Sequence, residues 1–202
     1  NTREVIEQAA QEHDWIRCVY RTDRGRRLAG TGVICAFNEG YGALSVGNWD
    51  YIVKLDADLS FEPGYFASCF SRFEENDSIG IAGGIVGYRE NGEFVPEALS
   101  DPPFHVRGAT KIYRRACWEK IAPLVQAPGW DTIDELKANM HGFATTTFRD
   151  LYCVQLKKTG SADGRWRDYV KNGRANFNTG YHPVFLAAKC LKRTLTRGAL
   201  LN

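Results

Sequence analysis

The sequence predicts an α/β fold in which a mixed, mainly parallel sheet is flanked by helices. Short apolar runs that are typical of strands alternate with segments whose apolar residues recur every three to four positions, and this alternation is typical of the class. The chain has 202 residues, of which 44% are hydrophobic. That is enough to bury one core, so a single domain is the first expectation.

The clearest predicted elements lie near the middle of the chain. The apolar run Tyr51–Leu55 predicts a buried strand. A helix should follow it, with Ser60 in the N-cap region and Pro63 in the first turn. Other helices are expected over 3–13, 33–43, 115–121, 131–141 and from 183 onward. Other strands are expected over 16–20, 79–86, 106–113, 143–148 and 151–156, with a hairpin over 88–94.

The two halves of the chain carry opposite charge. Residues 1–101 hold 9 Lys and Arg against 17 Asp and Glu (net −8), whereas residues 102–202 hold 17 against 7 (net +10). A basic half suits a diphosphate or an anionic lipid surface, although a chance distribution of solvated charge also explains it. We expect no nucleic-acid partner.

The cysteines and the apolar stretches exclude two classes of protein. The six cysteines form no CxxC pair, which argues against a disulfide framework or a structural zinc site and favours the cytoplasm. The longest uncharged apolar stretch, residues 79–88, is far shorter than the roughly 20 residues that span a bilayer.

Two carboxylates follow the predicted strand Tyr51–Leu55. Asp56 and Asp58 are one residue apart, so in an extended chain both side chains point to the same side. Mg²⁺ and Mn²⁺ prefer oxygen ligands and are commonly held by one or two carboxylates plus substrate phosphates. The pattern indicates a metal–diphosphate site, and the alternative is local hydrogen bonding in a turn.

A second group of acidic residues opens the helix predicted over 131–141. Asp131 stands at the helix start, where capping alone would account for a carboxylate. The functional alternative is a general base that takes the proton of an attacking hydroxyl. Asp134 lies three residues further on and shares roughly the same helix face, so it remains a second candidate.

The order of these motifs resembles the family 2 glycosyltransferases, which have the GT-A fold. The resemblance covers nearly the whole chain and rests on Asn1-Thr2-Arg3-Glu4, Ala36-Phe37-Asn38-Glu39-Gly40, Leu55-Asp56-Ala57-Asp58, and Arg107-Gly108-Ala109-Thr110 with Tyr113-Arg114-Arg115. It implies a GT-A-like, Rossmann-type sheet over residues 1–180, followed by a basic amphipathic helix over 181–202. The family's first strand would then precede Asn1, and part of the donor pocket with it.

The resemblance implies a role for each matched residue. Asp58 would hold Mg²⁺ or Mn²⁺ on the diphosphate of a nucleotide-sugar donor, and Asp56 would orient the ribose or share the metal. Asn38 would belong to the donor site, and Arg114 and Arg115 would offset the charge of the leaving group. The reaction implied is inverting sugar transfer to a glycan or lipid-linked acceptor in cell-surface polysaccharide synthesis.

The resemblance also implies which carboxylate is the base. In many family members the catalytic Asp stands eleven residues before the glycine that closes its helix, and Asp131 stands eleven residues before Gly142. Asp134 would need a gap in that register, so it is the second choice.

The sequence departs from the family at one position. Many relatives carry a metal-ligating His where this chain has Gln155 or Leu156, and an amide is a poorer ligand. A degenerate domain without turnover is therefore one alternative, and a nucleotide-sugar pyrophosphorylase is another. The C-terminal helix is basic and amphipathic, so it could lie in a membrane interface at the cytoplasmic face or pack against the domain.

Overall fold

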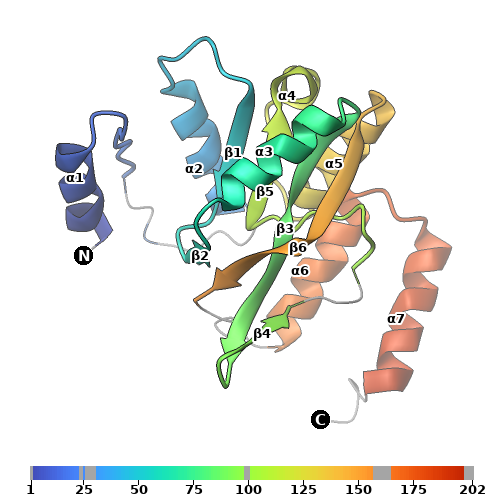
Figure 1. Cartoon of the computed structure of the whole chain (residues 1–202). Coiled ribbons are helices and arrows are strands. Elements are labelled where there is room, and N and C mark those ends of the chain that lie inside the picture. The colour runs from blue at the N-terminus through green and yellow to red at the C-terminus, as the bar shows by residue number, and fades with distance from the viewer. Residues whose placement is uncertain (1, 23–24, 26–30, 98–100, 157–164, 198–202) are drawn as a thin grey trace.

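The computed structural model describes residues 2–22, 25, 31–97, 101–156 and 165–197, with side chains left undescribed over 165–169 and 193–197. The described helices are α1 (Thr2–Glu12), α2 (Thr31–Gly42), α3 (Tyr65–Glu75), α4 (Arg115–Ile121), α5 (Trp130–Met140), α6 (Arg165–Asn178) and α7 (Pro183–Arg197). The described strands are β1 (Tyr51–Leu55), β2 (Leu59–Phe61), β3 (Ile79–Glu90), β4 (Glu93–Pro96), β5 (Thr110–Arg114) and β6 (Ala144–Gln155). They form a central sheet with helices on both faces (Figure 1).

The sheet is mixed. Its order is β1-β5-β3-β6-β2, and β4 pairs with β3 at the end of a hairpin. Only β3 and β6 pair in parallel among the described strands, so antiparallel pairs are more frequent than the sequence led us to expect. The difference comes mainly from β5, which lies between β1 and β3 and runs antiparallel to both. The predicted mixed α/β sheet flanked by helices is confirmed.

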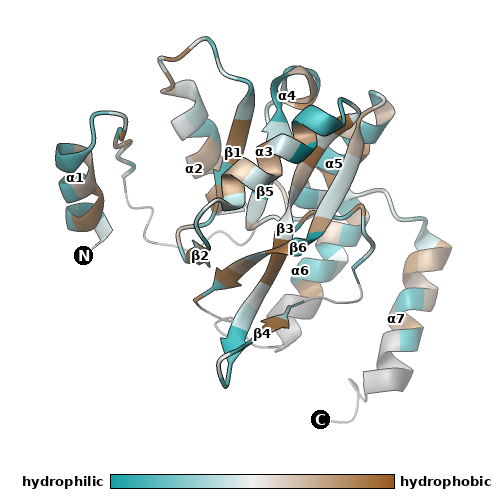
Figure 2. Ribbon diagram, in the orientation of Figure 1, coloured by the Kyte–Doolittle hydropathy of each residue, from teal (hydrophilic) through white to brown (hydrophobic). Residues whose placement is uncertain are grey.

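The core has two parts, one on each face of the sheet. On one face, α2, α4 and α5 pack around Trp118, Tyr113 and Ile81. On the other face, α3 packs around Phe73 and Ile112. In Figure 2 hydrophobic colour appears on β1 and in stretches of β3 and β6, as expected for a sheet that is covered on both faces.

The start of α3 differs from the sequence expectation. Ser60 lies in β2, and the N-cap residue is Gly64, whose φ of 83° is a conformation that glycine adopts without steric cost. The helix buries Tyr65, Cys69 and Phe73, which are four residues apart. The apolar face was therefore predicted correctly, whereas the cap was wrong because β2 extends through Ser60.

Other differences concern strands and one helix. Residues 16–20 are not in a strand, β5 begins at Thr110, and residues 143–148 and 151–156 form the single irregular strand β6. Helix α6 was not predicted. Strand β6 stays continuous because it pairs with β3 on both sides of its irregularity.

The two terminal helices expose most of their surface. α1 buries no residue, and α7 stands away from the sheet in Figure 1. Among the described residues, no helix is long and apolar enough to cross a membrane.

Candidate active site

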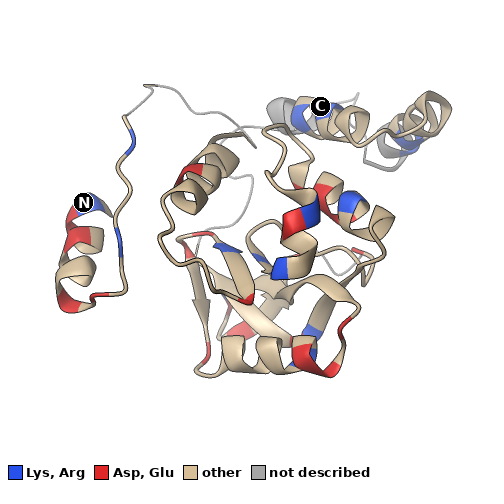
Figure 3. Cartoon of the chain, turned by 90° about the horizontal axis from the view of Figure 1, so that it is seen from above, with Lys and Arg blue, Asp and Glu red and all other residues tan. Residues whose placement is uncertain are grey.

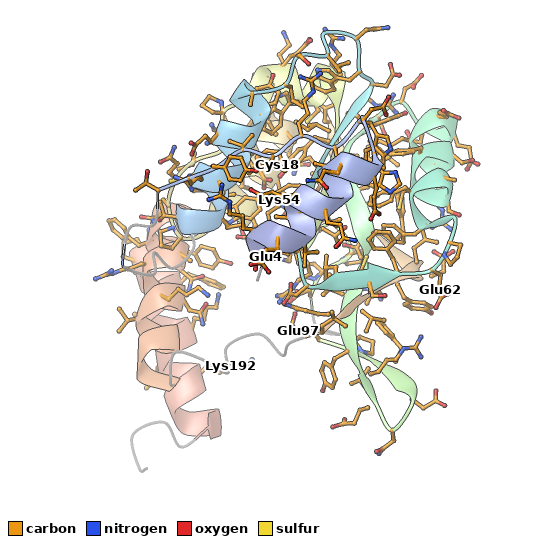
Figure 4. All side chains as sticks on the ribbon, turned by 90° about the vertical axis from the view of Figure 1, so that its left-hand side faces the viewer. Glu4, Cys18, Lys54, Glu62, Glu97 and Lys192 are labelled. Atoms are coloured by element: carbon orange, nitrogen blue, oxygen red, sulfur yellow. The ribbon has the colours of Figure 1, made fainter. Side chains whose placement is uncertain are left out.

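Asp56 lies where β1 ends, and a buried lysine holds it. The Asp56 backbone N–H donates to the carbonyl oxygen of Ala109 at 2.9 Å. Lys54 is 2% exposed, and its ammonium pairs with the Asp56 carboxylate and donates to the carbonyl oxygen of Gly108 at 2.5 Å. Sequence analysis missed Lys54, although a charged residue inside an apolar strand signals a paired side chain. Lys54 is labelled in Figure 4, which views the molecule from the side of α1.

Asp58 lies in the turn between β1 and β2, next to the end of β6. Its carbonyl oxygen accepts a hydrogen bond from the Leu156 backbone N–H at 2.8 Å, and Leu59 pairs with Gln155 across the β2–β6 ladder. The structure therefore brings residues 155 and 156 beside the backbone of Asp58.

Asp131 lies in the first turn of α5, against Gly108. A Cβ added to Gly108 would lie 3.2 Å from Oδ2 of Asp131 and 2.8 Å from the Trp130 ring, so only glycine lets the two segments approach so closely. Because Lys54 joins Gly108 to Asp56, one short chain of contacts links Asp131 to the end of β1. Asp131 and Asp56 therefore lie near each other at the carboxyl end of β1.

Asp134 lies in the core. It is 2% exposed, accepts from Lys111 Nζ at 2.8 Å and accepts from the Tyr113 hydroxyl at 2.6 Å. Burial raises the pKa of Asp134 to about 6 even though Lys111 opposes that shift. Asp131 is only partly buried, so α5 exposes the carboxylate of Asp131 to solvent more than that of Asp134.

A network of ionisable side chains surrounds the N-terminal half of α5. Lys111 is fully buried and also donates to Glu135 at 3.0 Å and to the backbone oxygen of Asp131 at 2.5 Å. Glu135 accepts from the Val106 N–H at 2.7 Å and contacts His105 Nδ1 at 3.0 Å. Because Lys111 binds the Asp131 backbone, the network fixes the helix turn that carries Asp131.

The three other predicted donor-site residues have hydrogen-bond partners of their own. Asn38, on α2, donates through its amide to the carbonyl oxygen of Leu124 at 3.3 Å. Arg114 pairs in register with Tyr51, the first residue of β1, and donates to the Ile79 carbonyl oxygen at 2.9 Å. Arg115 donates to Gly47 and pairs with Glu119.

The position of the two arginines argues against their expected role. Antiparallel pairing puts Arg114 opposite the start of β1, while Asp56 follows its end. Strands rise roughly 3.4 Å per residue, so a strand length separates Arg114 and Arg115 from the carboxylates. Arg114 and Arg115 therefore lie away from Asp56 and Asp58.

The described side chains do not form a complete metal site by themselves. Among the described residues, no group of three or more His, Cys, Asp or Glu side chains could hold a metal ion. Asp56 is already paired with Lys54, so Asp58 is the carboxylate left for a metal. This fits an ion that takes one or two protein oxygens and completes its shell with phosphate oxygens and water.

Comparison with known proteins identifies the family. The sequence profile described as Glycosyl transferase family 2 matches residues 1–127, more than half of the chain. The chain belongs to glycosyl transferase family 2. No match was found among curated proteins.

The fold of this family 2 chain is also found in a solved structure. That structure is described as the mannosyltransferase PcManGT from Pyrobaculum calidifontis in complex with GDP-Man and Mn²⁺. The identity is 17% and the TM-score is 0.55, and the match covers 88% of this chain and 50% of the other. The family 2 chain therefore spans about half the length of that mannosyltransferase, and the likeness supports the GT-A-like fold.

Proposed function

We propose that the chain is the catalytic part of an inverting glycosyltransferase that moves a sugar from a nucleotide-diphosphate sugar to a glycan or lipid-linked acceptor. One observation carries the proposal. Asp131 contacts Gly108, and Lys54 joins Gly108 to Asp56, so a base and a diphosphate site would lie together at the carboxyl end of β1. Ligands of open α/β sheets bind at the carboxyl ends of strands, which is where Asp56 stands.

In the proposed reaction Asp131 is the general base. Its carboxylate takes the proton of the acceptor hydroxyl while that oxygen forms a bond to the anomeric carbon, and the bond from that carbon to the diphosphate oxygen breaks. A single in-line displacement inverts the anomeric carbon. Lys111 positions the base through the Asp131 backbone oxygen.

The donor diphosphate would be bound at the DxD motif. Asp58 would hold Mg²⁺ or Mn²⁺, and Asp56 would orient the ribose or share the ion. A bound divalent ion would offset the charge that develops on the leaving diphosphate. The GDP-Man and Mn²⁺ named for the mannosyltransferase support a donor and an ion of these classes.

A role in cell-surface polysaccharide synthesis would suit a protein that works at the cytoplasmic face of a membrane. Exposed apolar residues on α7, Val184 at 70%, Phe185 at 58% and Leu191 at 61%, support a peripheral membrane contact. α7 contains no Asp or Glu, and Figure 3 shows basic positions on it.

An assay of the full protein with a panel of sugar nucleotides and a divalent ion tests the proposal. The expected result is release of a nucleoside diphosphate together with a transferred or hydrolysed sugar. A degenerate domain, which Gln155 in place of His would favour, would bind a sugar nucleotide and release nothing. Formation of a nucleoside triphosphate from pyrophosphate would instead identify a pyrophosphorylase.

A further inference from the structure

A pocket of about 370 Å³ lies beside the candidate active site, and we call it the hairpin pocket. Its walls come from three segments: the β3–β4 hairpin, residues 101–107, and the irregular part of β6. Its size is at the small end of the range of small-molecule sites, roughly 300–1,000 Å³.

One part of the hairpin pocket is a rigid aromatic wall. The rings of Phe94 and Tyr152 lie 4.7 Å apart, and Pro96, Pro102 and Pro103 line the pocket near them. Phe94 packs directly over Gly87, where an added Cβ would lie 2.5 Å from the ring. A fixed aromatic and proline surface suits the apolar face of a sugar ring.

An arginine projects into the pocket because β6 is irregular. Gly84 pairs with Phe148 and the next residue, Ile85, pairs with Tyr152, so Arg149, Asp150 and Leu151 form an extra loop in the strand. Bulges of this kind redirect side chains next to functional sites. Asp150 binds Arg72 on α3 at 2.7 Å, whereas Arg149 lines the pocket.

The charge of Arg149 is not compensated within the described part of the chain. The other arginine of the pocket, Arg107, is paired with Glu97 at 2.6 Å and approaches Asp101 at 3.6 Å. No carboxylate of the described residues pairs with Arg149, which is exposed. The pocket therefore offers one guanidinium to an incoming anion.

The pocket also contains a carboxylate oxygen that could accept a hydrogen bond from a ligand. Oδ2 of Asp101 is buried, and Nη1 of Arg107 lies 3.6 Å from it, beyond hydrogen-bond distance, so this oxygen has no hydrogen-bond partner among the described residues. A hydroxyl group of a bound sugar would satisfy it, and an unsatisfied buried oxygen is costly otherwise.

The hairpin pocket is close to the proposed base along the chain. His105 and Arg107 line the pocket, and the next residue, Gly108, touches Asp131. We propose that the hairpin pocket binds the acceptor, and that this acceptor is a saccharide carrying an oxyanion, a carboxylate or a phosphate, that pairs with Arg149. The assignment of the occupant as acceptor rests on the proposed function.

Binding of charged and neutral sugars to the chain, without donor, tests the inference. The probes are a disaccharide that contains glucuronic acid, glucose 1-phosphate, and the neutral disaccharide maltose, each titrated by NMR. At least one of the two charged probes should bind more tightly than maltose. The probe that binds more tightly shows whether the pocket prefers a carboxylate or a phosphate. Arg149→Gln should weaken that binding about tenfold, while Arg174→Gln, an equal change of charge on α6 outside the pocket, should leave it unchanged.

Three results would overturn the inference: equal binding of maltose and the charged probes, unchanged binding in Arg149→Gln, or an equal loss in Arg174→Gln. Donor turnover by the parent protein is measured separately. If the parent turns over a donor while Arg149→Gln binds the charged probes as the parent does, only the inference fails. If Arg149 is needed for oxyanion binding but no donor is turned over, the proposed function fails and the pocket remains a saccharide site.

Discussion

Asp56 and Asp58 differ in how much of their charge is already paired. Lys54 neutralises Asp56, while the described contact of Asp58 is through its backbone oxygen to Leu156. Asp58→Ala should therefore lower donor turnover by about 100-fold or more, because the metal would lose its protein ligand. The thermal unfolding midpoint should stay near that of the parent.

The control for this change is Asp14→Ala, which removes an exposed carboxylate far from β1 in the sequence. It should retain parental turnover. Near-parental activity of Asp58→Ala would show that the metal assignment is wrong.

Gln155 lies where a third metal ligand could be added. It pairs with Leu59, the residue after Asp58. Gln155→His should tighten Mn²⁺ binding measured by calorimetry, since neutral imidazole is a better transition-metal ligand than an amide oxygen. The control Gln11→His adds a histidine on exposed α1 and should leave Mn²⁺ affinity unchanged. Equal Mn²⁺ affinity of the parent and Gln155→His would show that residue 155 is not near the metal.

The positions of the acidic candidates in the fold were easier to predict from the sequence than those of the basic candidates. Asp56, Asp58 and Asp131 stand at ends of elements, and such ends can be read from apolar patterns. The role of Arg114 could not be judged in that way, because it depends on the direction of β5, which tertiary pairing decides. Lys54 and Lys111 were missed since their partners are distant in sequence.

At the scale of elements, the contacts of α5 with β5 and residues 105–106 carry a pH dependence. Burial acts to lower the pKa of His105, but the hydrogen bond and charge of Glu135 outweigh it and raise that pKa above 6.5, with Lys111 opposing and Asp131 adding to the rise. A raised pKa in the folded state means that the His105 contribution to stability is fully present below pH 6.5. It is lost as pH rises through the folded pKa.

His105→Gln should therefore lower the free energy of unfolding more at pH 5.5 than at pH 9. Denaturant unfolding of the parent and His105→Gln at the two pH values checks this. Asp134 titrates in both proteins, so its effect largely cancels when their free energies of unfolding are subtracted. In a Glu135→Gln background the same substitution should show a much smaller pH dependence. If His105→Gln lowered the free energy of unfolding equally at both pH values, a charged pair between His105 and Glu135 would be contradicted.

The order of the elements was predictable, and their irregularities were not. Strand β1 and helix α4 have the bounds expected from their apolar patterns. The loop of extra residues in β6 was not foreseen, because residues 149–150 look like a turn between two strands in the sequence. Pairing with β3 on both sides keeps them in one strand, and this detail puts Arg149 in the hairpin pocket.

At the scale of the whole molecule, α7 offers an exposed apolar and basic surface. Packing against the domain does not cover Val184 or Leu191, while Lys189 reaches Asn176 on α6 at 3.2 Å. The chain should therefore sediment with vesicles that contain anionic lipid, and the variant Val184→Ser/Leu191→Ser should lose this binding. Equal sedimentation of the parent and the variant would exclude α7 as the contact.

The proposed active site requires Asp131 and the DxD motif to act on the same bound donor. The most direct test measures kcat and donor binding for Asp131→Asn and Asp134→Asn side by side. Asp131→Asn should lower kcat by about 10²- to 10⁴-fold with donor binding little changed. Asp134→Asn should instead lower the free energy of unfolding by about 3 kcal/mol, because it leaves buried Lys111 with a weaker partner. In the folded protein, Asp134→Asn should reduce kcat much less than Asp131→Asn does. Parental kcat in Asp131→Asn, or a larger loss of kcat in folded Asp134→Asn, would contradict the account.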